Sequence, residues 1–458
     1  MLSSRYLIRQ FLPTFRKLPV HGRFFGSVAR HAVSANNGNA AGRGNDSSDD
    51  NNNNAKGQNK NPLKRFLIDK IRLTGPISIA EYMQICVGSP GAGYYSKNDG
   101  QIFGARGDFV TSPEFTQMLG ELLGVWVVNE FFKLSHNSDW HLIELGPGSG
   151  CLMHDVLGVA RKFDLTEQHM QIRLVETSRQ LIREQATILC GDDDAFDTND
   201  VEKCSKKSLF GPEVHWHDNI FEIPQKFGII LAHEFFDALP VHKFKRTQDR
   251  GWREVLIGLD PENPQNFQYQ VAHGQTVAQK LYLTKKIEES AASSSYLEIS
   301  PVSAYMCDQM AERINQNGGC ALIVDYGPYT PLGDKRTGDT LRAYRSHKIV
   351  DPLDFPGRCD VTCDVDFDFL VENLRDKVAI FGPLDQKTFL ENMGIKVRFE
   401  KLLKACQSEE ETQYLQKSFD LLTDPKQMGS RFKVMALFPK VIEEMMKKVP
   451  PSGFCPLS

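Results

Sequence analysis

The sequence predicts an α/β fold, in which a mostly parallel β-sheet is covered by helices on both faces. The first observation is that, from Trp140 onward, short apolar stretches alternate with stretches of helical periodicity. The second is a glycine-rich turn, "GPGSG" at 146–150, which directly follows the first apolar stretch. The third is that two further runs, "FGIILAHE" at 227–234 and "CALIVDYG" at 320–327, have the length and composition of strands.

The folded part is expected to begin near Pro62. Apolar residues at helical spacing predict a helix that starts there and ends at Gly75. Ser78 and Glu81 have the spacing of a capping box, so a second helix is expected directly after the first. The glycine-dense stretch 88–107 predicts irregular structure.

The rest of the chain supplies the expected sheet. Residues 191–208 are acidic and then basic, and are expected to form a surface loop. An alternating pattern over 242–259 predicts a hairpin that interrupts the α/β core. The expected strands lie in 140–145, 170–176, 213–217, 227–234, 320–327, 377–382 and 432–438, and the helices between the first strands lie in 153–163 and 179–189.

The N-terminus has the pattern of a mitochondrial presequence. The first 45 residues contain no Asp or Glu, and arginines recur there between Leu, Ile and Phe. An ordinary basic disordered tail is the alternative. The chain is therefore divided into a presequence over 1–33, a disordered Asn/Gly/Ser-rich linker over 34–61, a helical N-terminal or lid region over 62–139, an α/β domain over 140–440 with an insertion at about 241–300, and a C-terminal tail over 441–458.

Composition excludes several classes of protein. The chain has 458 residues and a net charge of -4, so no bulk attraction for nucleic acid or anionic lipid is expected. No apolar run approaches the roughly 18 residues that a membrane span requires. The ten cysteines form no CxxC pair, which favours reduced thiols and argues against a metal site.

The glycine turn is the first motif that carries chemistry. Glycines let the backbone turn tightly and approach a ligand ahead of a helix N-terminus. Glu144, Gly146, Gly148 and Gly150 form the pattern E-x-G-x-G-x-G, which resembles the first motif of class I S-adenosylmethionine-dependent methyltransferases. Cys151 occupies the position where a dinucleotide fingerprint requires its third glycine. A purely structural turn is the alternative.

Polar residues after the next two strands extend this candidate cofactor site. Glu176, at the end of the second strand, can accept hydrogen bonds from both ribose hydroxyls of a nucleoside. Asp218 and Asn219 follow the third strand, and the resemblance to methyltransferase sheets implies that side chains at this place can reach the adenine amino group. A surface carboxylate at Glu176 and an Asx turn at Asp218 and Asn219 are the alternatives.

Two carboxylates end the fourth strand, in "GIILAHEFFDALP" at 228–240. Burying a carboxylate is costly unless the group is paired or used. Because ligands of α/β sheets lie outside the carboxyl ends of the strands, Glu234 and Asp237 are expected to face the methyl group of the cofactor. They are the candidate catalytic residues.

Two further segments are candidates for substrate binding. In "GDFVTSPEF", Ser112 and Glu114 are expected at a helix N-terminus that acts as a lid, with plain helix capping as the alternative. In the polar stretch 340–370, Arg342 and Tyr344 are expected to bind a substrate or to order the loop, with a solvated loop as the alternative.

Several of these motifs coincide in one family. The stretches "GDFVTSPEF", "ELGPGSG", "EFFDALPVHKF", "VDYG" and "LRAYR" resemble the MidA-like family, mitochondrial complex I assembly factors with protein arginine methyltransferase activity. The similarity runs from about Pro62 to Phe438. It implies a class I S-adenosyl-L-methionine-dependent methyltransferase fold, with a Rossmann-like seven-stranded sheet, a helical N-terminal part and insertions.

The resemblance also implies a cofactor, a substrate and a location. These are S-adenosyl-L-methionine, an arginine on a core subunit of respiratory complex I, and the mitochondrial matrix, which would make the protein a protein-arginine omega-N methyltransferase. Two departures stand out. His233 occupies a position where the family usually has Asn, and Ser149, Gly150 and Cys151 replace a basic residue followed by Gly-Thr.

A guanidinium acceptor would explain the two carboxylates after the fourth strand. Carboxylates grip a guanidinium with paired hydrogen bonds and can receive the departing proton. Glu234 is expected to make the main contact, and Asp237 the second contact or to organise the pocket. The alternatives are a cofactor-binding assembly chaperone without essential catalysis and, less favoured, a methyltransferase acting on nucleic acid or a small molecule. The sequence leaves the oligomeric state open.

Overall fold

The computed structural model describes residues 61–89, 91–96, 116–134, 139–167, 169–191, 205–291, 294–330, 339–346 and 348–455. The expected presequence, and the expected linker up to residue 60, lie outside these ranges. No helix within the described ranges is long and apolar enough to cross a membrane.

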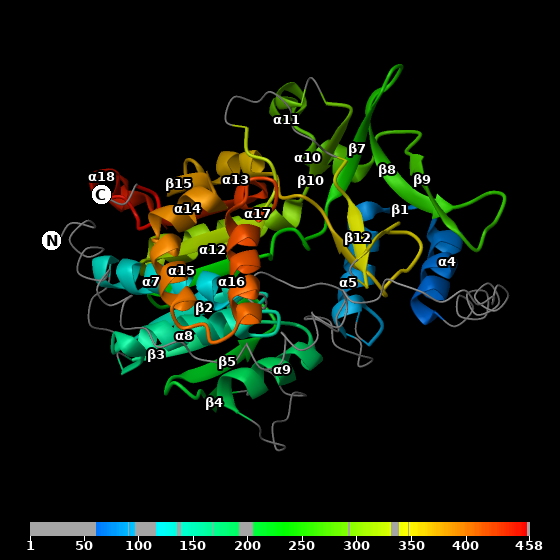
Figure 1. The fold of residues 1–458 in the computed structure, drawn as a ribbon. Helices are drawn as coiled ribbons and strands as arrows, with labels where there is room; N and C mark the ends of the chain where they lie inside the picture. Colours follow the sequence, from blue (N-terminus) through cyan, green and yellow to red (C-terminus); the bar gives the residue numbers. More distant parts are fainter. Residues whose placement is uncertain are drawn as a thin grey trace, which may run out of the picture.

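An eight-stranded sheet forms the centre of the molecule (Figure 1). Its strand order is β15-β16-β11-β6-β2-β3-β5-β4. The five middle strands are parallel: β2 (Trp140–Leu145), β3 (Met170–Val175), β5 (Glu213–His217), β6 (Gly228–His233) and β11 (Gly319–Tyr326). The antiparallel strands are β16 (Phe432–Pro439), β15 (Val378–Asp385) and β4 (Ser205–Lys207). The carboxyl ends of the parallel strands therefore share one edge of the sheet.

The described sheet has one strand more than the expected seven. The additional strand, β4, lies in the stretch 191–208 that was expected to be a surface loop, and it pairs with β5 so that Lys206 lies opposite Val214. Its sequence, Ser-Lys-Lys, has no apolar residue, so periodicity could not reveal it. Backbone hydrogen bonds to β5 hold this edge strand, and lysines are common on exposed edges.

Each central strand contributes side chains to two separate cores. In β6, Ile229 and Leu231 belong to one core, while Ile230 and Ala232 belong to the other, because successive side chains point to opposite faces. The first core is covered by α7 (Gln117–Leu134), α8 (Cys151–Lys162) and α9 (Arg179–Cys190), and the second by α12 (Pro301–Asn317) and α13 (Phe367–Leu374).

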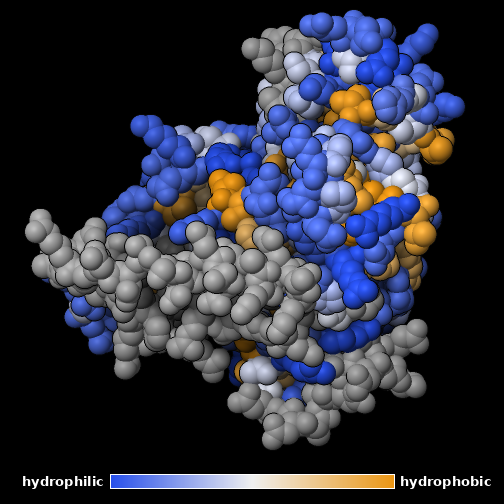
Figure 2. Space-filling view, turned by 90° about the vertical axis from the view of Figure 1, so that its right-hand side faces the viewer, coloured by the Kyte–Doolittle hydropathy of each residue, from blue (hydrophilic) through white to orange (hydrophobic). Residues whose placement is uncertain are grey.

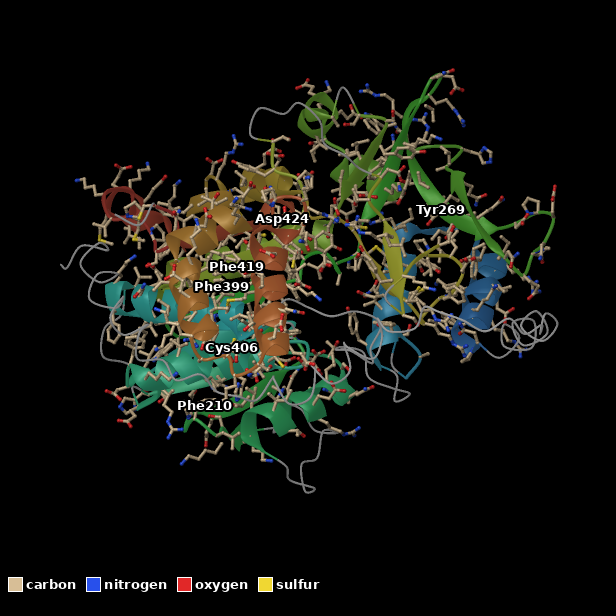
Figure 3. The ribbon with its side chains drawn as sticks, viewed as in Figure 1. Phe210, Tyr269, Phe399, Cys406, Phe419 and Asp424 are labelled. Carbon is tan, nitrogen blue, oxygen red and sulfur yellow. The ribbon has the colours of Figure 1, made fainter. Side chains whose placement is uncertain are left out.

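Helices near the C-terminus extend the first core. Phe399 and Phe419 stack across two of them, α15 and α16, with ring centroids 4.5 Å apart (Figure 3). These C-terminal elements are α14 (Gln386–Asn392), α15 (Ile395–Leu403), α16 (Glu409–Thr423), α17 (Met428–Arg431), η5 (Lys440–Ile442) and α18 (Glu443–Lys448).

A second lobe lies beside the central sheet and is built largely from the chain between β6 and β11 (Figure 1). Its five-stranded sheet contains the expected hairpin as β7 and β8. The elements are β1 (Ile77–Ser78), β7 (His242–Thr247), β8 (Gly251–Leu259), β9 (Phe267–Val271), β10 (Tyr296–Ile299), α10 (Val277–Tyr282) and α11 (Lys285–Ser290).

The N-terminal helices belong to this second lobe. The two expected helices are present as α4 (Pro62–Thr74) and α5 (Ile79–Gly88), and Ser78 caps α5 as the sequence predicted. They share a core with β8 and with a three-stranded sheet of β12 (Arg342–Arg345), β13 (Lys348–Val350) and β14 (Asp360–Thr362). Helix α7 packs on α8 and the central sheet instead, so the stretch 62–139 contributes to both lobes.

The outer face of the second lobe is mainly polar. Figure 2 shows this face from the right-hand side of Figure 1, and hydrophobic residues form only small groups on its described surface. The exposed apolar side chains of α4 and β9 are Phe66, Leu73 and Tyr269. This face therefore carries no large apolar patch on the described residues of these elements.

Candidate functional site

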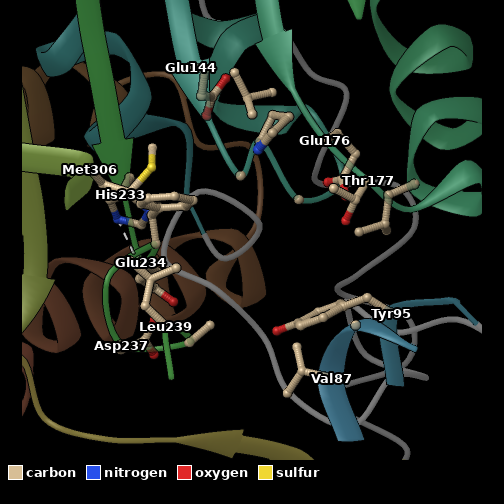
Figure 4. A pocket seen from close by; sticks show the side chains of 18 of the residues that line it. Val87, Tyr95, Glu144, Glu176, Thr177, His233, Glu234, Asp237, Leu239 and Met306 are labelled. Atoms are coloured by element: carbon tan, nitrogen blue, oxygen red, sulfur yellow. Dashed lines mark ion pairs between the residues drawn. The ribbon is translucent and has the colours of Figure 1, made fainter. Parts of the chain in front are cut away.

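A cavity of about 350 Å³ lies where the carboxyl ends of the central strands meet the second lobe (Figure 4). The turns and loops after β2, β3, β5 and β6 form one side of it. Val87 and Gly88 of α5, Tyr95 of the short helix η1 (Tyr94–Ser96) and Asp360 of β14 form another part of its wall. The cavity is thus enclosed by segments that are far apart in the sequence.

Most of the predicted site residues line this cavity. These are Glu144, Gly146, Gly148, Glu176, Asp218, Asn219, Glu234 and Asp237. Gly150 does not line the cavity but is the N-cap of α8. Arg342 and Tyr344 lie on β12 behind the wall, and Ser112 and Glu114 lie outside the described residues.

The glycine turn has the backbone conformation that the motif required. Gly146, Gly148 and Gly150 have φ angles of 63°, 56° and 90°, a region that side chains other than glycine rarely adopt. A Cβ atom at Gly146 would also lie 3.0 Å from the ring of Phe235. The turn can therefore bring its backbone close to a ligand in the cavity.

Glu144 is a buried carboxyl group at the end of β2. Its Oε2 atom has no hydrogen-bond partner among the described residues. Burial raises the pKa of Glu144 to about 8, so the group holds a proton at neutral pH when nothing stabilises its charge. Such a group is suited to a ligand that brings a positive charge or hydrogen-bond donors.

Glu176 is held rigidly beside the glycine turn. Its carboxylate accepts hydrogen bonds from the Ser178 backbone N–H at 2.8 Å and from Gln185 Nε2 at 3.3 Å. Gln185 also donates to the Gly148 carbonyl at 2.7 Å, so one amide group joins the turn to Glu176. Burial raises the pKa of Glu176 to about 7. Sequence reasoning missed Gln185, because nothing in the helix pattern distinguishes it from other buried polar residues.

Asp218 and Asn219 line the cavity but also have structural partners. Asp218 forms an ion pair with Arg179, with Nη1 and Oδ1 3.1 Å apart. Asn219 caps the short helix η4 (Ile220–Glu222), because its Oδ1 accepts from the Phe221 N–H at 3.0 Å. The positions of Asp218 and Asn219 are therefore compatible with both predictions from the sequence, contact with an adenine and an Asx turn.

The loop after β6 is anchored by a buried acid on the neighbouring strand. Oδ2 of Asp325, in β11, accepts hydrogen bonds from the backbone N–H groups of Phe235 at 3.1 Å, Phe236 at 2.9 Å and Asp237 at 3.4 Å. Glu234 adopts the left-handed conformation with a φ of 49°. Asp325 was missed, although its position at the end of the strand in "VDYG" was the available signal.

Asp237 is influenced by Tyr326 and by Arg342 of the three-stranded sheet of β12, β13 and β14, which is called the third sheet below. Burial raises its pKa to about 6, while Tyr326 and the charge of Arg342 act in the opposite direction. The Tyr326 hydroxyl donates to Thr362 Oγ1 at 2.8 Å, and the Arg342 guanidinium lies 5.0 Å from the centre of the Tyr326 ring. Arg342 itself is paired with Asp364. Arg342 therefore supports the site through Tyr326, without lining the cavity.

His233 is the last residue of β6 and lines the cavity. It is 7% exposed, and its Nε2 atom has no hydrogen-bond partner among the described residues. This atom lies 3.6 Å from Oε1 of Glu234. Burial lowers the pKa of His233 to about 4, so the imidazole is neutral at physiological pH.

The described wall of the cavity is acidic. Six carboxyl groups line it, and no lysine or arginine does so among the residues that the structure describes; the six are Glu144, Glu176, Asp218, Glu234, Asp237 and Asp360. Such a wall favours cationic ligands. The described residues contain no group of three or more His, Cys, Asp or Glu placed to hold a metal ion.

These features fit a nucleoside cofactor that carries a positive charge. The glycine turn offers close backbone approach, and Glu176, after β3 and beside that turn, can accept hydrogen bonds from a ribose. The unpartnered oxygen of Glu144 and the remaining carboxylates can balance the charge of a sulfonium or ammonium group. A second cationic group, an acceptor, can then lie beside Glu234 and Asp237.

Comparison with known proteins agrees with this geometry. Residues 122–384 match the family described as "Putative S-adenosyl-L-methionine-dependent methyltransferase". A protein named "Protein arginine methyltransferase NDUFAF7 homolog, mitochondrial", from Caenorhabditis elegans, is 39% identical over 87% of this chain and 92% of its own length. "Protein arginine methyltransferase NDUFAF7, mitochondrial", from Danio rerio, is 41% identical over 87% of this chain and 93% of its own length.

A solved structure has the same fold. It is a Burkholderia thailandensis protein, described as a "likely methyl transferase" and bound to S-adenosyl-homocysteine, with a TM-score of 0.65 and 21% identity. The match covers 87% of this chain and 95% of that one. The predicted methyltransferase fold is thereby confirmed.

Proposed function

This chain belongs to the family of S-adenosyl-L-methionine-dependent methyltransferases whose sequence pattern it matches, and from that premise we propose that it methylates an arginine side chain of a protein. Membership of the family supports S-adenosyl-L-methionine as the cofactor. The chemistry of the cavity and the names of the relatives support arginine as the methyl acceptor. Glu234 and Asp237 are the proposed catalytic residues.

The observation that carries the proposal is the acidic wall of the cavity. An arginine guanidinium keeps its positive charge in proteins and presents five N–H donors. Six carboxyl groups, with no lysine or arginine among the described lining residues, complement such an acceptor. An anionic acceptor, such as a nucleic-acid phosphate, would be repelled by the same wall.

The residues of this chain have separate tasks in the reaction. When bound, S-adenosyl-L-methionine supplies an electrophilic methyl group. Glu234 and Asp237 orient the guanidinium by charge-assisted hydrogen bonds, which hold its attacking nitrogen in place. The nitrogen must lose one proton, and Glu234 is the proposed acceptor of that proton. Asp325 and the left-handed backbone at Glu234 fix the loop, so the Glu234 carboxylate stays in place to receive it. Phe235, which packs near Gly146, helps to exclude water.

The proposed setting is the mitochondrial matrix. The relatives are named mitochondrial, and the first 45 residues have the composition of a presequence. The resemblance to complex I assembly factors supports a core subunit of respiratory complex I as the substrate, with methylation serving complex I assembly. The long match to the named arginine methyltransferases supports the same acceptor chemistry.

Mass spectrometry of arginine methylation on complex I subunits, with and without this protein, tests the proposal. We expect one methylated arginine to disappear when the protein is absent and to return with the wild type. Glu234→Gln should fail to restore it and should lower the methylation rate of purified protein by about a hundredfold. A Glu234→Gln protein that methylates at the full rate, or methylation that appears on lysine or nucleic acid instead, would contradict the proposal.

A further inference from the structure

Tyr95 forms the wall of the cavity that faces the two catalytic candidates. Figure 4 shows Tyr95 on the other side of the cavity from Glu234 and Asp237, with its hydroxyl group pointing toward them. Burial, and then the negative charges of Asp360 and Asp237, raise the pKa of Tyr95 well above its usual range. The hydroxyl therefore stays protonated and lies within electrostatic reach of both acids.

The partner of this hydroxyl is a carboxylate of the third sheet. Tyr95 donates a hydrogen bond to Oδ1 of Asp360 at 3.0 Å. Asp360 is 4% exposed, lines the cavity, and lies opposite Tyr344 in the pairing of β14 with β12. The stretch 340–370 therefore contributes to the cavity through Asp360 and not through Arg342 or Tyr344, the residues predicted from the sequence.

Tyr95 is also tied to the cofactor side of the cavity. Its backbone carbonyl accepts a hydrogen bond from the Ser178 hydroxyl, while the Ser178 N–H donates to Glu176 at 2.8 Å. Tyr94 packs against Leu181, which itself lines the cavity. The position of Tyr95, and with it that of Asp360, is thus set by the same residues that hold Glu176.

A second feature, a nitrogen atom that lies 3.6 Å from Oε1 of Glu234, offers a hydrogen-bonding group to a ligand in this cavity. His233 is nine-tenths buried in the wall of the same cavity, and its Nε2 atom has no hydrogen-bond partner among the described residues. A buried neutral imidazole nitrogen without a partner is costly, so a ligand that supplies an N–H group would remove that cost.

We propose that Asp360, held by Tyr95, is a third carboxylate that binds the acceptor guanidinium, together with Glu234 and Asp237. This inference rests on the proposed function. A guanidinium is planar and has N–H groups on three edges, so it can meet several carboxylates at once. The hydrogen bond from the Tyr95 hydroxyl fixes the position of the Asp360 carboxylate in the wall of the cavity. A guanidinium spreads five N–H donors over three nitrogen atoms, whereas a lysine ammonium carries three on one atom, so a third carboxylate held by Tyr95 favours arginine over lysine.

Binding of small acceptor analogues to the full-length protein tests this role. The probe is N-acetyl-arginine amide, titrated by NMR into protein saturated with S-adenosyl-homocysteine, with N-acetyl-lysine amide as the comparison. Asp360→Asn should weaken binding of the arginine probe by about tenfold, and Tyr95→Phe by several-fold, because each removes part of a charge-assisted network. The Kd of S-adenosyl-homocysteine, measured by calorimetry, should stay within about twofold, which shows that both variants are folded.

Two matched substitutions outside the cavity serve as controls. Tyr269→Phe, on β9, is the control for Tyr95→Phe. Asp351→Asn, between β13 and β14, is the control for Asp360→Asn, because an asparagine there can still accept a hydrogen bond from the Leu353 N–H. Both should bind the arginine probe as the wild type does. If Asp360→Asn and Tyr95→Phe also bind it with wild-type affinity, the inference is wrong and the proposed function stands. If the wild type binds the lysine probe as tightly as the arginine probe, the proposed function fails and the inference fails with it.

Discussion

Asp237 is a residue whose protonation state is set by its surroundings. Its carboxyl group is buried beside Asp325, and both acids have raised pKa values because burial disfavours their charged forms. The charges of Asp237 and Glu234 raise the pKa of Asp325 further, well above its usual range. As the pH rises, Asp237 therefore ionises first, with a pKa of about 6 in the free protein.

This order of ionisation predicts how catalysis depends on pH. The proposed contact with a guanidinium requires the charged form of Asp237, and a raised pKa means that this form is present only above about pH 6. At saturating cofactor, kcat/KM for the acceptor should rise about tenfold per pH unit below that pH and level off above it. Steady-state kinetics between pH 5 and 8 measure this profile.

Asp237→Asn is the matched control for this profile. It keeps the size of the side chain but cannot ionise, so we expect a much lower kcat/KM without the acidic limb. An unchanged limb in Asp237→Asn would assign the titration to another group, such as Glu234.

At the residue scale, the sequence predicted the positions of several acids that line the cavity. Glu144, Glu176, Glu234 and Asp237 follow recognisable strands, and all four line the cavity. Asp325 was missed although it also ends a recognisable strand, whereas Tyr95 and Asp360 could not be found in this way. Their roles arise from contacts over long sequence separations, such as the 265 positions between Tyr95 and Asp360, and no local pattern encodes those contacts.

At the scale of single elements, we expect the turn between β2 and α8 to decide whether the cofactor can bind. Gly148 has a φ of 56°, which a β-branched residue adopts only with strain, and its carbonyl accepts the hydrogen bond from Gln185. Gly148→Val should therefore distort the turn and place a side chain in the cavity. We expect the affinity for S-adenosyl-homocysteine to fall at least a hundredfold, as measured by calorimetry, and methylation to be lost.

The same variant separates an enzyme from an assembly chaperone. If methylation is required, folded Gly148→Val should fail to restore complex I in cells that lack the protein. Equal rescue by Gly148→Val and the wild type would favour the chaperone. Cys151→Ser, at a residue beside the turn with an ordinary helical conformation, is expected to retain cofactor binding.

Strands with mostly apolar sequences were easier to predict than short strands with polar residues. The buried strands β6 and β11 have nearly continuous apolar sequences, so their positions were clear in advance. The third sheet was not predicted, because β12 and β13 are short and carry polar residues on partly exposed positions. Such strands are stabilised by pairing with neighbours and not by their own pattern.

At the scale of the whole molecule, one buried ion pair joins two helices far apart in the sequence. Arg398 of α15 is paired with Glu121 of α7, and the Arg398 side chain is fully buried. Arg398→Met should lower the free energy of unfolding by about 3 kcal/mol, because it leaves Glu121 buried without its partner. Urea denaturation measures this loss.

A double variant tests the physical reason for that loss. Glu121→Leu combined with Arg398→Met removes both charges, so most of the lost stability should return. If the double variant is as unstable as Arg398→Met alone, the loss comes from packing and not from an unpaired charge.

The N-terminal helices have a consequence for how the chain folds. Tyr82 of α5 donates a hydrogen bond to the Pro352 carbonyl, 270 positions later, and Asn61 donates to Pro356, 295 positions later. At a synthesis rate of about 5–20 residues per second, these helices wait on the order of 15–60 s before their partners leave the ribosome. Until β8 and then the segment around Pro352 have been made, the apolar faces of α4 and α5 lack the partners of their shared core. We therefore expect these two helices, although they come early among the described elements, to reach their final packing late.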